Sequence, residues 1–246
     1  MRMNLYSDIL DRPSSTPLAK YRAKIAFVSP PGRRDSFEQE ARCFVGVSLE
    51  NRNFEPARFY AQLEWAARRF SDVQILVGDG IHRISVETVH GLSPRQAEER
   101  ALELGRSFMR DNAHLLASFQ DMAQINYLTC SAIQDIPSYS AFLSKLWGYF
   151  DRVPSFRQSV EAFAAHYHRK NWDQLSERDR AYRLKRSCEY FLEEFAIFAC
   201  LVERGNSVMV YPGSFSTLAE IANGDFPGIP PELEALTVVS LQLKKR

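Results

Sequence analysis

The sequence lacks the features that mark metalloproteins, membrane proteins and general polyanion binders. Its four cysteines form no closely spaced pair, so we expect reduced thiols rather than a disulfide framework or a zinc site. Lys and Arg number 31 against 30 Asp and Glu, which leaves a net charge of +1. No uninterrupted apolar run approaches the roughly 18 residues of a membrane span. We therefore expect a cytoplasmic protein in which any nucleic-acid contact comes from a local basic patch.

Short apolar runs alternate with helical patterns along the 246 residues, and no linker or repeat divides them. This order favours a single domain, 1–246, built on one open α/β sheet, with 1–23 as a loose polar arm. The expected strands are 24–29, 42–47, 73–77, 124–128, 207–211 and 236–243, with Gly78-Asp79-Gly80 closing the third as a turn. The expected helices are 55–70, 93–119, 138–150, 154–170 and 176–204.

Ser48 lies in the turn between the expected strand 42–47 and the helix that begins near Glu55. In an α/β sheet such a turn lies at the carboxyl edge of a strand, where ligands usually bind. Ser48 is therefore a candidate nucleophile. The alternative is a turn or capping serine, because serine is among the favoured helix caps.

Tyr190 and Glu194 are four residues apart on the expected helix 176–204, so they share one face. A glutamate among aromatic residues is costly to bury without a partner, and a primary ammonium group would be a suitable one. The alternative is a glutamate at the edge of the apolar face that reaches solvent or an arginine. We expect the neighbouring Glu193 to be solvated.

Tyr211 ends the expected strand 207–211 and is followed by Pro212. A tyrosine at the carboxyl end of a strand lies at the same rim as Ser48. The alternative is an aromatic side chain that only covers the core.

In this order the motifs resemble those of the cyclodipeptide synthases. That family shows a strand ending in Gly-Val/Ile-Ser with an asparagine three residues later, then a Tyr-x-x-x-Glu helix, then a strand ending in tyrosine. The matching residues here are Gly46-Val47-Ser48 with Asn51, Tyr190 with Glu194, and Tyr211-Pro212. The family is divided by these same positions, and Asn51 looks like one branch whereas Pro212 looks like the other.

The resemblance implies a Rossmann-like domain with a mostly parallel central sheet flanked by helices, similar to the catalytic domain of class I tyrosyl- and tryptophanyl-tRNA synthetases. It implies a monomer that joins the amino acids of two aminoacyl-tRNAs into a cyclic dipeptide without ATP, metal or cofactor. Ser48 would form the covalent aminoacyl-enzyme. Tyr190 and Glu194 would hold the ammonium group, and Tyr190 would relay a proton. Ser48 would be activated either by the terminal ribose hydroxyl of the tRNA or by Tyr211. Backbone N–H groups after Ser48, together with Asn51, would stabilise the oxyanion.

By position, five residues are candidates to line the pocket for the first side chain: Phe44, Gly46, Gly78, Ile197 and Met209. Apart from the glycines they are large and apolar, which favours an apolar amino acid. Basic residues on two expected helices are candidates for phosphate contacts with tRNA. They are Arg95, Arg100, Arg106 and Arg110 on the first, and Arg183, Lys185 and Arg186 on the second.

Three other functions remain as alternatives. An α/β-hydrolase requires Gly-x-Ser-x-Gly and a late histidine, but Glu50 replaces the last glycine and the last histidine is His168. An ATP-using ligase would need a phosphate-binding loop, and the sequence has no Gly-x-x-x-x-Gly-Lys-Ser/Thr motif. A non-catalytic aminoacyl-tRNA-binding protein would explain the basic segments but would leave Ser48 and Glu194 without a role.

Overall fold

A six-stranded sheet forms the centre of the protein in a computed structural model, which describes residues 20–168, 174–213 and 216–246. The strands are β1 (Tyr21–Ser29), β2 (Arg42–Val47), β3 (Asp72–Val77), β4 (Gln124–Thr129), β5 (Val208–Tyr211) and β6 (Thr237–Lys245). Their order across the sheet is β1-β6-β5-β2-β3-β4. Only the β1–β6 pair is antiparallel among the described strands, which confirms the mostly parallel sheet.

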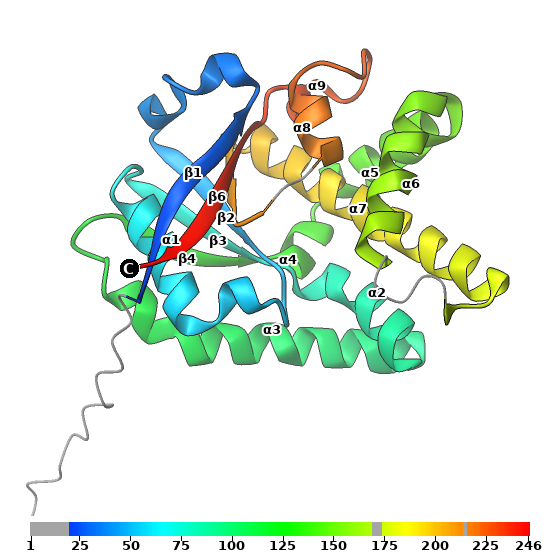
Figure 1. Ribbon diagram of the computed structural model, residues 1–246, viewed down its shortest axis with the longest axis horizontal. Coiled ribbons are helices and arrows are strands. Elements are labelled where there is room, and N and C mark those ends of the chain that lie inside the picture. The colour runs from blue at the N-terminus through cyan, green and yellow to red at the C-terminus, as the bar shows by residue number, and fades with distance from the viewer. Residues whose placement is uncertain (1–19, 169–173, 214–215) are drawn as a thin grey trace, which may run out of the picture.

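Helices cover both faces of this sheet (Figure 1). They are α1 (Pro56–Ala67), α2 (Asp79–His90), α3 (Pro94–Ala117), α4 (Cys130–Gln134), α5 (Pro137–Arg152), α6 (Pro154–His168), α7 (Glu177–Glu203), α8 (Ser216–Ala222) and α9 (Pro231–Glu234). Short 3-10 turns span Pro31–Arg33, Phe37–Gln39 and Arg52–Phe54. Helices α1 and α3 lie on one face, whereas α5, α6 and α7 lie together on the other.

The central strands β2, β3 and β5 are largely buried on both faces, as in other parallel sheets. In β2, Phe44 belongs to the core that α7 covers, whereas Cys43 and Val45 belong to the core that α1 and α3 cover. This alternation explains why β2 reads as a continuous apolar run. Because β2 and β5 are parallel neighbours, with Phe44 opposite Met209, both strands end at the same edge of the sheet.

Two expectations about local structure were wrong. Residues 21–23 of the expected arm belong to β1, because they pair with residues 243–245 of β6, a distant partner that local composition does not reveal. Residues 1–19 and the last two residues of the expected helix 154–170 lie outside the described residues. The expected turn at residues 78–80 instead leads into α2, which begins at Asp79. Its glycine and β-branched residues are weak helix formers, and the burial of Ile81 and Ile84 stabilises it.

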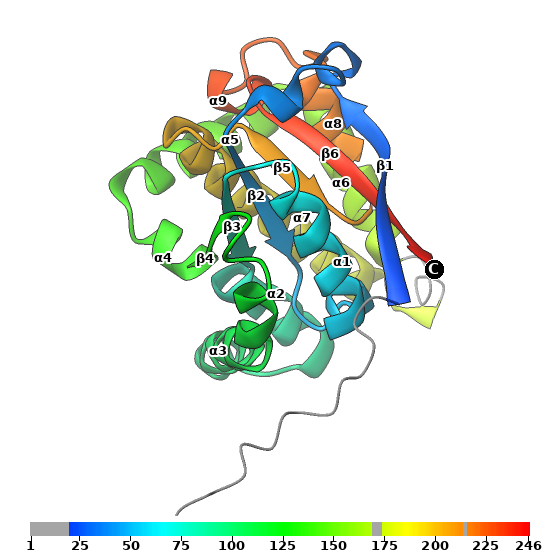
Figure 2. The ribbon, with the colours of Figure 1, turned by 90° about the vertical axis from the view of Figure 1, so that its left-hand side faces the viewer.

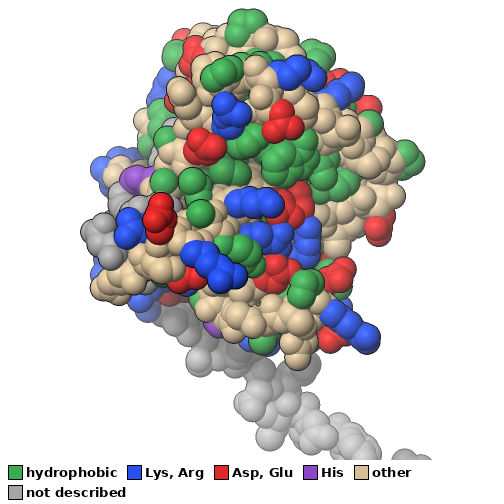
Figure 3. Space-filling model, turned by 90° about the vertical axis from the view of Figure 1, so that its right-hand side faces the viewer, with side chains coloured by type: hydrophobic (Ala, Val, Ile, Leu, Met, Phe, Trp, Pro, Cys, Tyr) green, Lys and Arg blue, Asp and Glu red, His purple; other side chains and the backbone are tan. Residues whose placement is uncertain are grey.

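Positive and negative side chains are interspersed over the face in Figure 3, as the nearly balanced composition predicts. No helix in the described part of the chain is long and apolar enough to cross a membrane.

Candidate active site

Ser48 and Tyr211 meet at the carboxyl edge of the sheet. Ser48 follows the last residue of β2, and Tyr211 is the last residue of β5. Their hydroxyl oxygens are 2.9 Å apart, and either hydroxyl could donate the hydrogen bond. The phenol is therefore placed to exchange a proton with the serine hydroxyl.

Asn51 holds this pair from the loop that follows β2. Its side-chain Nδ2 donates to the Tyr211 hydroxyl at 3.4 Å, and its Oδ1 accepts from the backbone N–H of Asn53 at 2.9 Å. Asn53 in turn donates from Nδ2 to the carbonyl oxygen of Pro212 at 3.0 Å. These contacts tie the loop after β2 to the end of β5 and fix the position of the phenol.

Glu194 is a buried carboxyl group with spare hydrogen-bonding capacity. Its residue is 8% exposed, and Oε2 accepts no hydrogen bond from the described residues. Burial raises the pKa of the Glu194 carboxyl to about 8. A cationic group beside it would oppose this shift and supply the missing partner.

Glu193 was expected to be solvated, and this was wrong. The residue is 5% exposed, and its carboxylate accepts two hydrogen bonds from the Arg83 guanidinium, at 2.6 and 2.9 Å. Gln134 donates a third at 3.0 Å. Glu193 therefore ties α7 to α2 and α4 and fixes the helix that carries Tyr190 and Glu194.

All five predicted catalytic residues line one cavity of about 680 Å³. They are Ser48, Asn51, Tyr190, Glu194 and Tyr211. The cavity thus brings together residues from the end of β2, the end of β5 and the middle of α7. Its size is within the range of small-molecule sites in proteins.

Ser48 and Glu194 also line a second, narrow cavity of about 10 Å³. Of the predicted pocket residues, Gly46, Gly78 and Met209 line it. Phe44 and Ile197 do not line it; both are fully buried, and the Phe44 ring packs against Phe198. Five further residues that the sequence analysis did not name as pocket candidates also line it: Val47, Leu76, Ile81, Cys130 and Phe198.

Histidines that the sequence did not single out as site residues also line the large cavity: His82, His90, His166 and His168. His82 Nε2 lies 3.1 Å from the Glu50 carboxylate, and burial lowers the pKa of His82 although Glu50 opposes the shift. Glu50 adopts a left-handed backbone conformation, with φ of 60°. His82 was missed because α2 was not predicted. No group of three or more metal-binding side chains occurs among the described residues.

The predicted tRNA-binding residues occupy different electrostatic surroundings. On α3, Arg95 pairs with Glu99, Arg106 with Glu103, and Arg110 with Asp111. Arg100 is exposed on the same helix. On α7, Lys185 is exposed and Arg183 is half-buried, whereas Arg186 pairs with both Glu87 and Glu189. The charge of Arg186 is therefore already matched within the protein.

Comparisons with known proteins identify the family and the fold. A family model described as cyclodipeptide synthase matches residues 33–237. Among curated proteins, none matches the chain. A structure of a cyclodipeptide synthase from Fluoribacter dumoffii superposes with a TM-score of 0.78 at 19% identity, covering 92% of this chain and 100% of that one.

Two other solved structures share the fold. A Mycobacterium tuberculosis protein, described as demonstrating that cyclodipeptide synthetases are related to type I tRNA synthetases, has a TM-score of 0.69 at 13% identity and covers 93% of this chain and 94% of its own. A cyclodipeptide synthase from Candidatus Glomeribacter gigasporarum, bound to Phe-tRNAPhe, has a TM-score of 0.62 at 15% identity and covers 83% of this chain and 88% of its own. Because the family match spans most of its length, the chain belongs to the cyclodipeptide synthase family.

Proposed function

We propose that this enzyme joins the amino acids of two aminoacyl-tRNAs into a cyclic dipeptide, by way of aminoacyl-Ser48 and dipeptidyl-Ser48 intermediates. The main support is the 2.9 Å contact between Ser48 and Tyr211 in a cavity that Glu194 also lines. The relative that binds Phe-tRNAPhe supports a charged tRNA as the donor. The ester of an aminoacyl-tRNA is already activated, so the reaction needs no ATP. Residues 1–246 would act as one catalytic domain of a cytoplasmic monomer.

In the first step, Ser48 Oγ attacks the ester carbonyl carbon of the first aminoacyl-tRNA. A new ester bond forms to Ser48, and the bond to the terminal ribose oxygen breaks. The serine proton passes to Tyr211, whose own hydroxyl proton goes to the departing ribose oxygen. Asn51 orients the phenol for this exchange through its 3.4 Å contact, and it would help to stabilise the developing oxyanion.

Tyr190 and Glu194 hold the ammonium group of the bound amino acid. Both line the cavity from α7, and one oxygen of Glu194 is buried without a hydrogen bond from the described residues. A primary ammonium group supplies the donor that this oxygen lacks and favours ionisation of the carboxyl group. The first amino acid is thus held at both its amine and its acyl carbon.

The second aminoacyl-tRNA supplies the amine for the next step. Its nitrogen attacks the aminoacyl-Ser48 carbonyl, which forms the peptide bond and frees the serine oxygen. The dipeptide is then transferred from the second tRNA to Ser48. In the last step, the first amine, deprotonated through Tyr190, attacks the dipeptidyl ester, closes the ring and releases Ser48.

The first side chain would enter beside Ser48 at the narrow cavity, which at about 10 Å³ has room for about one water molecule and would have to widen around the side chain. Gly46, Gly78 and Met209 border it, and its other walls are largely apolar. Since apolar walls favour apolar side chains, we expect amino acids such as Leu, Phe or Met. Such a pocket separates them by only about 1–3 kcal/mol per methylene, so mixed products are expected.

Mass spectrometry of medium from bacteria that express the protein tests this function. Cyclic dipeptides should accumulate with the wild type and be absent with Ser48→Ala. The side chains found would name the substrates. If the wild type matches an empty-vector culture, the proposed function is wrong.

A further inference from the structure

The part of the large cavity that α2 lines has no role in the reaction described above. From α2, His82 lines this cavity together with the proposed nucleophile Ser48. Figure 2 shows α2 between the sheet and α3. The backbone N–H of Gly78, the residue before α2, donates to the Val47 carbonyl oxygen at 3.0 Å. The start of α2 is therefore tied to the residue that precedes Ser48.

The amine of the second aminoacyl-tRNA must lose a proton before it can form the peptide bond. An α-amino group has a pKa of roughly 7.7–8.0, so most of it is ammonium at neutral pH and cannot attack. In the proposed reaction, Tyr211 serves Ser48, and Tyr190 relays the proton of the first amine. The peptide-forming step therefore needs another proton acceptor in the same cavity.

His82 forms an imidazole–carboxylate pair with Glu50, two residues after Ser48. Nε2 of His82 lies 3.1 Å from Oε2 of Glu50, and both residues line the cavity. The His82 side chain is 9% exposed and that of Glu50 is 50% exposed. Because a carboxylate only accepts hydrogen bonds, Nε2 carries the imidazole proton and Nδ1 keeps a lone pair. The pair thus fixes the tautomer in which Nδ1 can accept a proton.

Glu50 makes this contact from a strained backbone conformation. Among the described residues it is the only one other than glycine with a positive φ, which is 60°. Glycine adopts this conformation without a steric penalty, whereas a residue with a Cβ does not. Such strain is concentrated at functional sites. A glycine here would remove the strain but also the carboxylate that holds His82.

Two features favour the neutral form of His82, which is the form that accepts a proton. Burial lowers the pKa of His82, His90 at the end of α2 lowers it further, and Glu50 opposes the shift. His82 is also the fourth residue of α2, where the helix dipole disfavours a cation. At neutral pH the imidazole is therefore mostly uncharged.

We propose that His82, oriented by Glu50, is the general base for the second aminoacyl-tRNA. This inference rests on the proposed function and assigns a group to its peptide-forming step. His82 Nδ1 takes one proton from the second ammonium group, and the neutral nitrogen then bonds to the acyl carbon of aminoacyl-Ser48. The bond from that carbon to Ser48 Oγ breaks, and a second proton of the amine passes to Oγ through Tyr211. His82 then releases its proton to solvent.

A purely structural role for this pair makes a different prediction. A contact that only holds the turn with Ser48 would affect the acylation of Ser48 and peptide formation alike. A base for the second amine affects peptide formation alone. The two steps must therefore be measured separately.

The test follows the two steps in single turnovers. Excess protein is mixed with tRNA charged with one apolar amino acid, and excess charged tRNA is added once aminoacyl-Ser48 has formed. Mass spectrometry of acid-quenched samples gives the protein adduct and the cyclic dipeptide. His82→Gln should acylate Ser48 within about threefold of the wild-type rate but form the dipeptide about 10²-fold more slowly at pH 7.

Glu50→Gly tests the orienting role of the carboxylate. Its φ of 60° suits glycine, so this variant should fold. Without the carboxylate, the His82 ring is free to turn, and the dipeptide step should slow about tenfold while acylation stays close to wild type. If His82→Gln does not fold, Glu50→Gly decides the same question.

The pH profile gives a readout that a structural role would not change. Without its base, His82→Gln depends on amine that is already deprotonated. Its deficit in the dipeptide step should therefore shrink about tenfold per pH unit between pH 6.5 and 8. The other titratable groups that line the cavity are common to both proteins, so they cancel in this ratio: Glu50, His90, His166, His168, Tyr190, Glu194 and Tyr211.

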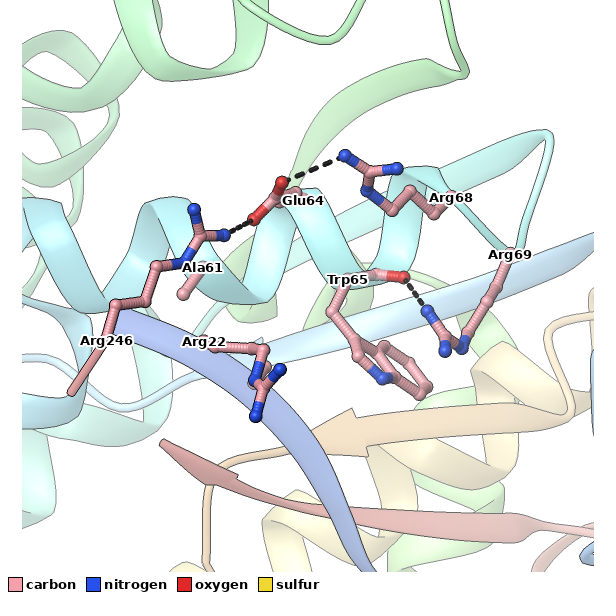
Figure 4. Close-up of a pocket in the computed structure, with 8 residues that line it drawn as sticks. Arg22, Ala61, Glu64, Trp65, Arg68, Arg69 and Arg246 are labelled. Carbon is pink, nitrogen blue, oxygen red and sulfur yellow. Dashed lines mark hydrogen bonds and ion pairs between the residues drawn. The ribbon is translucent and has the colours of Figure 1, made fainter. Parts of the chain in front are cut away.

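Two variants outside the cavity serve as matched controls. His114→Gln removes an exposed histidine from α3. Glu64→Gln removes a glutamate that bridges Arg68 and Arg246 in a separate cleft between β1 and α1 (Figure 4). Both should leave the rates of both steps within about twofold of wild type.

Normal dipeptide formation in His82→Gln would overturn the inference. Equal slowing of both steps would also overturn it, because the pair would then only hold the turn with Ser48. If wild type forms both aminoacyl-Ser48 and cyclic dipeptide and His82→Gln matches it, this inference fails and the proposed function stands. If wild type forms neither, the proposed function fails and this inference fails with it.

Discussion

The hydroxyl oxygens of Ser48 and Tyr211 are 2.9 Å apart, although 163 positions separate the two residues in the chain. The contact exists because β2 and β5 are adjacent parallel strands that end at one edge of the sheet. Tyr211 belongs to the sheet and Ser48 comes directly after strand β2, so the two adjacent strands set the distance between the proposed nucleophile and its proton relay.

Replacing Tyr211 with phenylalanine should slow the transfer to Ser48. The change removes the hydroxyl group that contacts Ser48 and Asn51 but keeps the ring that packs against Phe54. Loss of a positioned proton relay should reduce the single-turnover rate about 10²–10⁴-fold. Quenched-flow measurement of acyl transfer gives this rate. Tyr149→Phe is the matched control, since its hydroxyl donates to the Pro227 carbonyl away from the site, and it should leave the rate nearly unchanged.

The buried carboxyl group of Glu194 should make folding stability depend on pH. Burial raises its pKa from an ordinary value of 4.5 to about 8 in the folded protein, so the folded state binds the proton more tightly. The contribution of this carboxyl group to the free energy of unfolding is fully present below about pH 4.5. It decreases as the pH rises towards 8, because the proton that the folded state binds more tightly is then lost. Urea unfolding from pH 5 to 8 should show wild type losing up to about 1.4 kcal/mol per pH unit relative to Glu194→Gln. If the unfolding free energies of wild type and Glu194→Gln change with pH in the same way, Glu194 does not have a raised pKa in the folded protein.

Removing Glu193 should destabilise the protein far more than removing an exposed acid. Glu193→Ala leaves the Arg83 guanidinium, 26% exposed, without its bidentate partner, and should cost about 2–3 kcal/mol. Glu99→Ala, which breaks the exposed pair with Arg95, should cost less than about 1 kcal/mol. Urea unfolding at one pH measures both. Equal losses of unfolding free energy in the two variants would show that Glu193 does not hold α7 in place.

Changing the narrow cavity should change the products. A Cβ at Gly46 would meet Tyr211 and Met209 at 3.5 and 3.7 Å, ordinary contact distances, so Gly46→Ala should fold and favour smaller first residues. Met209→Ala should open the cavity and favour larger ones, at a stability cost of about 2–5 kcal/mol. Mass spectrometry of the cyclic dipeptides gives the product ratios. If both variants give the same product ratios as wild type, the side chain of the first amino acid does not bind in the narrow cavity.

The sequence predicted those parts of the fold and site that depend on local pattern. All six strands were found because their apolar runs are short and bounded by turn residues, as at 42–47 and 73–77. Ser48 and Tyr211 could be placed at one rim because parallel strands end at one edge. Helix α7 was predicted from its serine cap, and Ser176 does accept a hydrogen bond from the Asp179 backbone N–H.

What the sequence did not reveal depends on distant partners. Glu193 and Glu194 are adjacent and chemically identical, and only the position of Arg83 on the unpredicted α2 separates their roles. The start of β1 depends on the end of β6. Phe44 was expected in the pocket because it lies two residues before Gly46, but its ring packs into the core against Phe198.

The central claim is that Ser48 carries the amino acid, and intact-protein mass spectrometry tests it most directly. The protein is mixed with bacterial tRNA charged with one apolar amino acid at a time and quenched in acid within seconds. Wild type should gain the mass of one aminoacyl group or one dipeptidyl group with at least one of these tRNAs. Ser48→Ala should gain neither, and Ser85→Ala, a serine of the same cavity with no assigned role, should still gain one. An adduct that persists in Ser48→Ala would contradict the account.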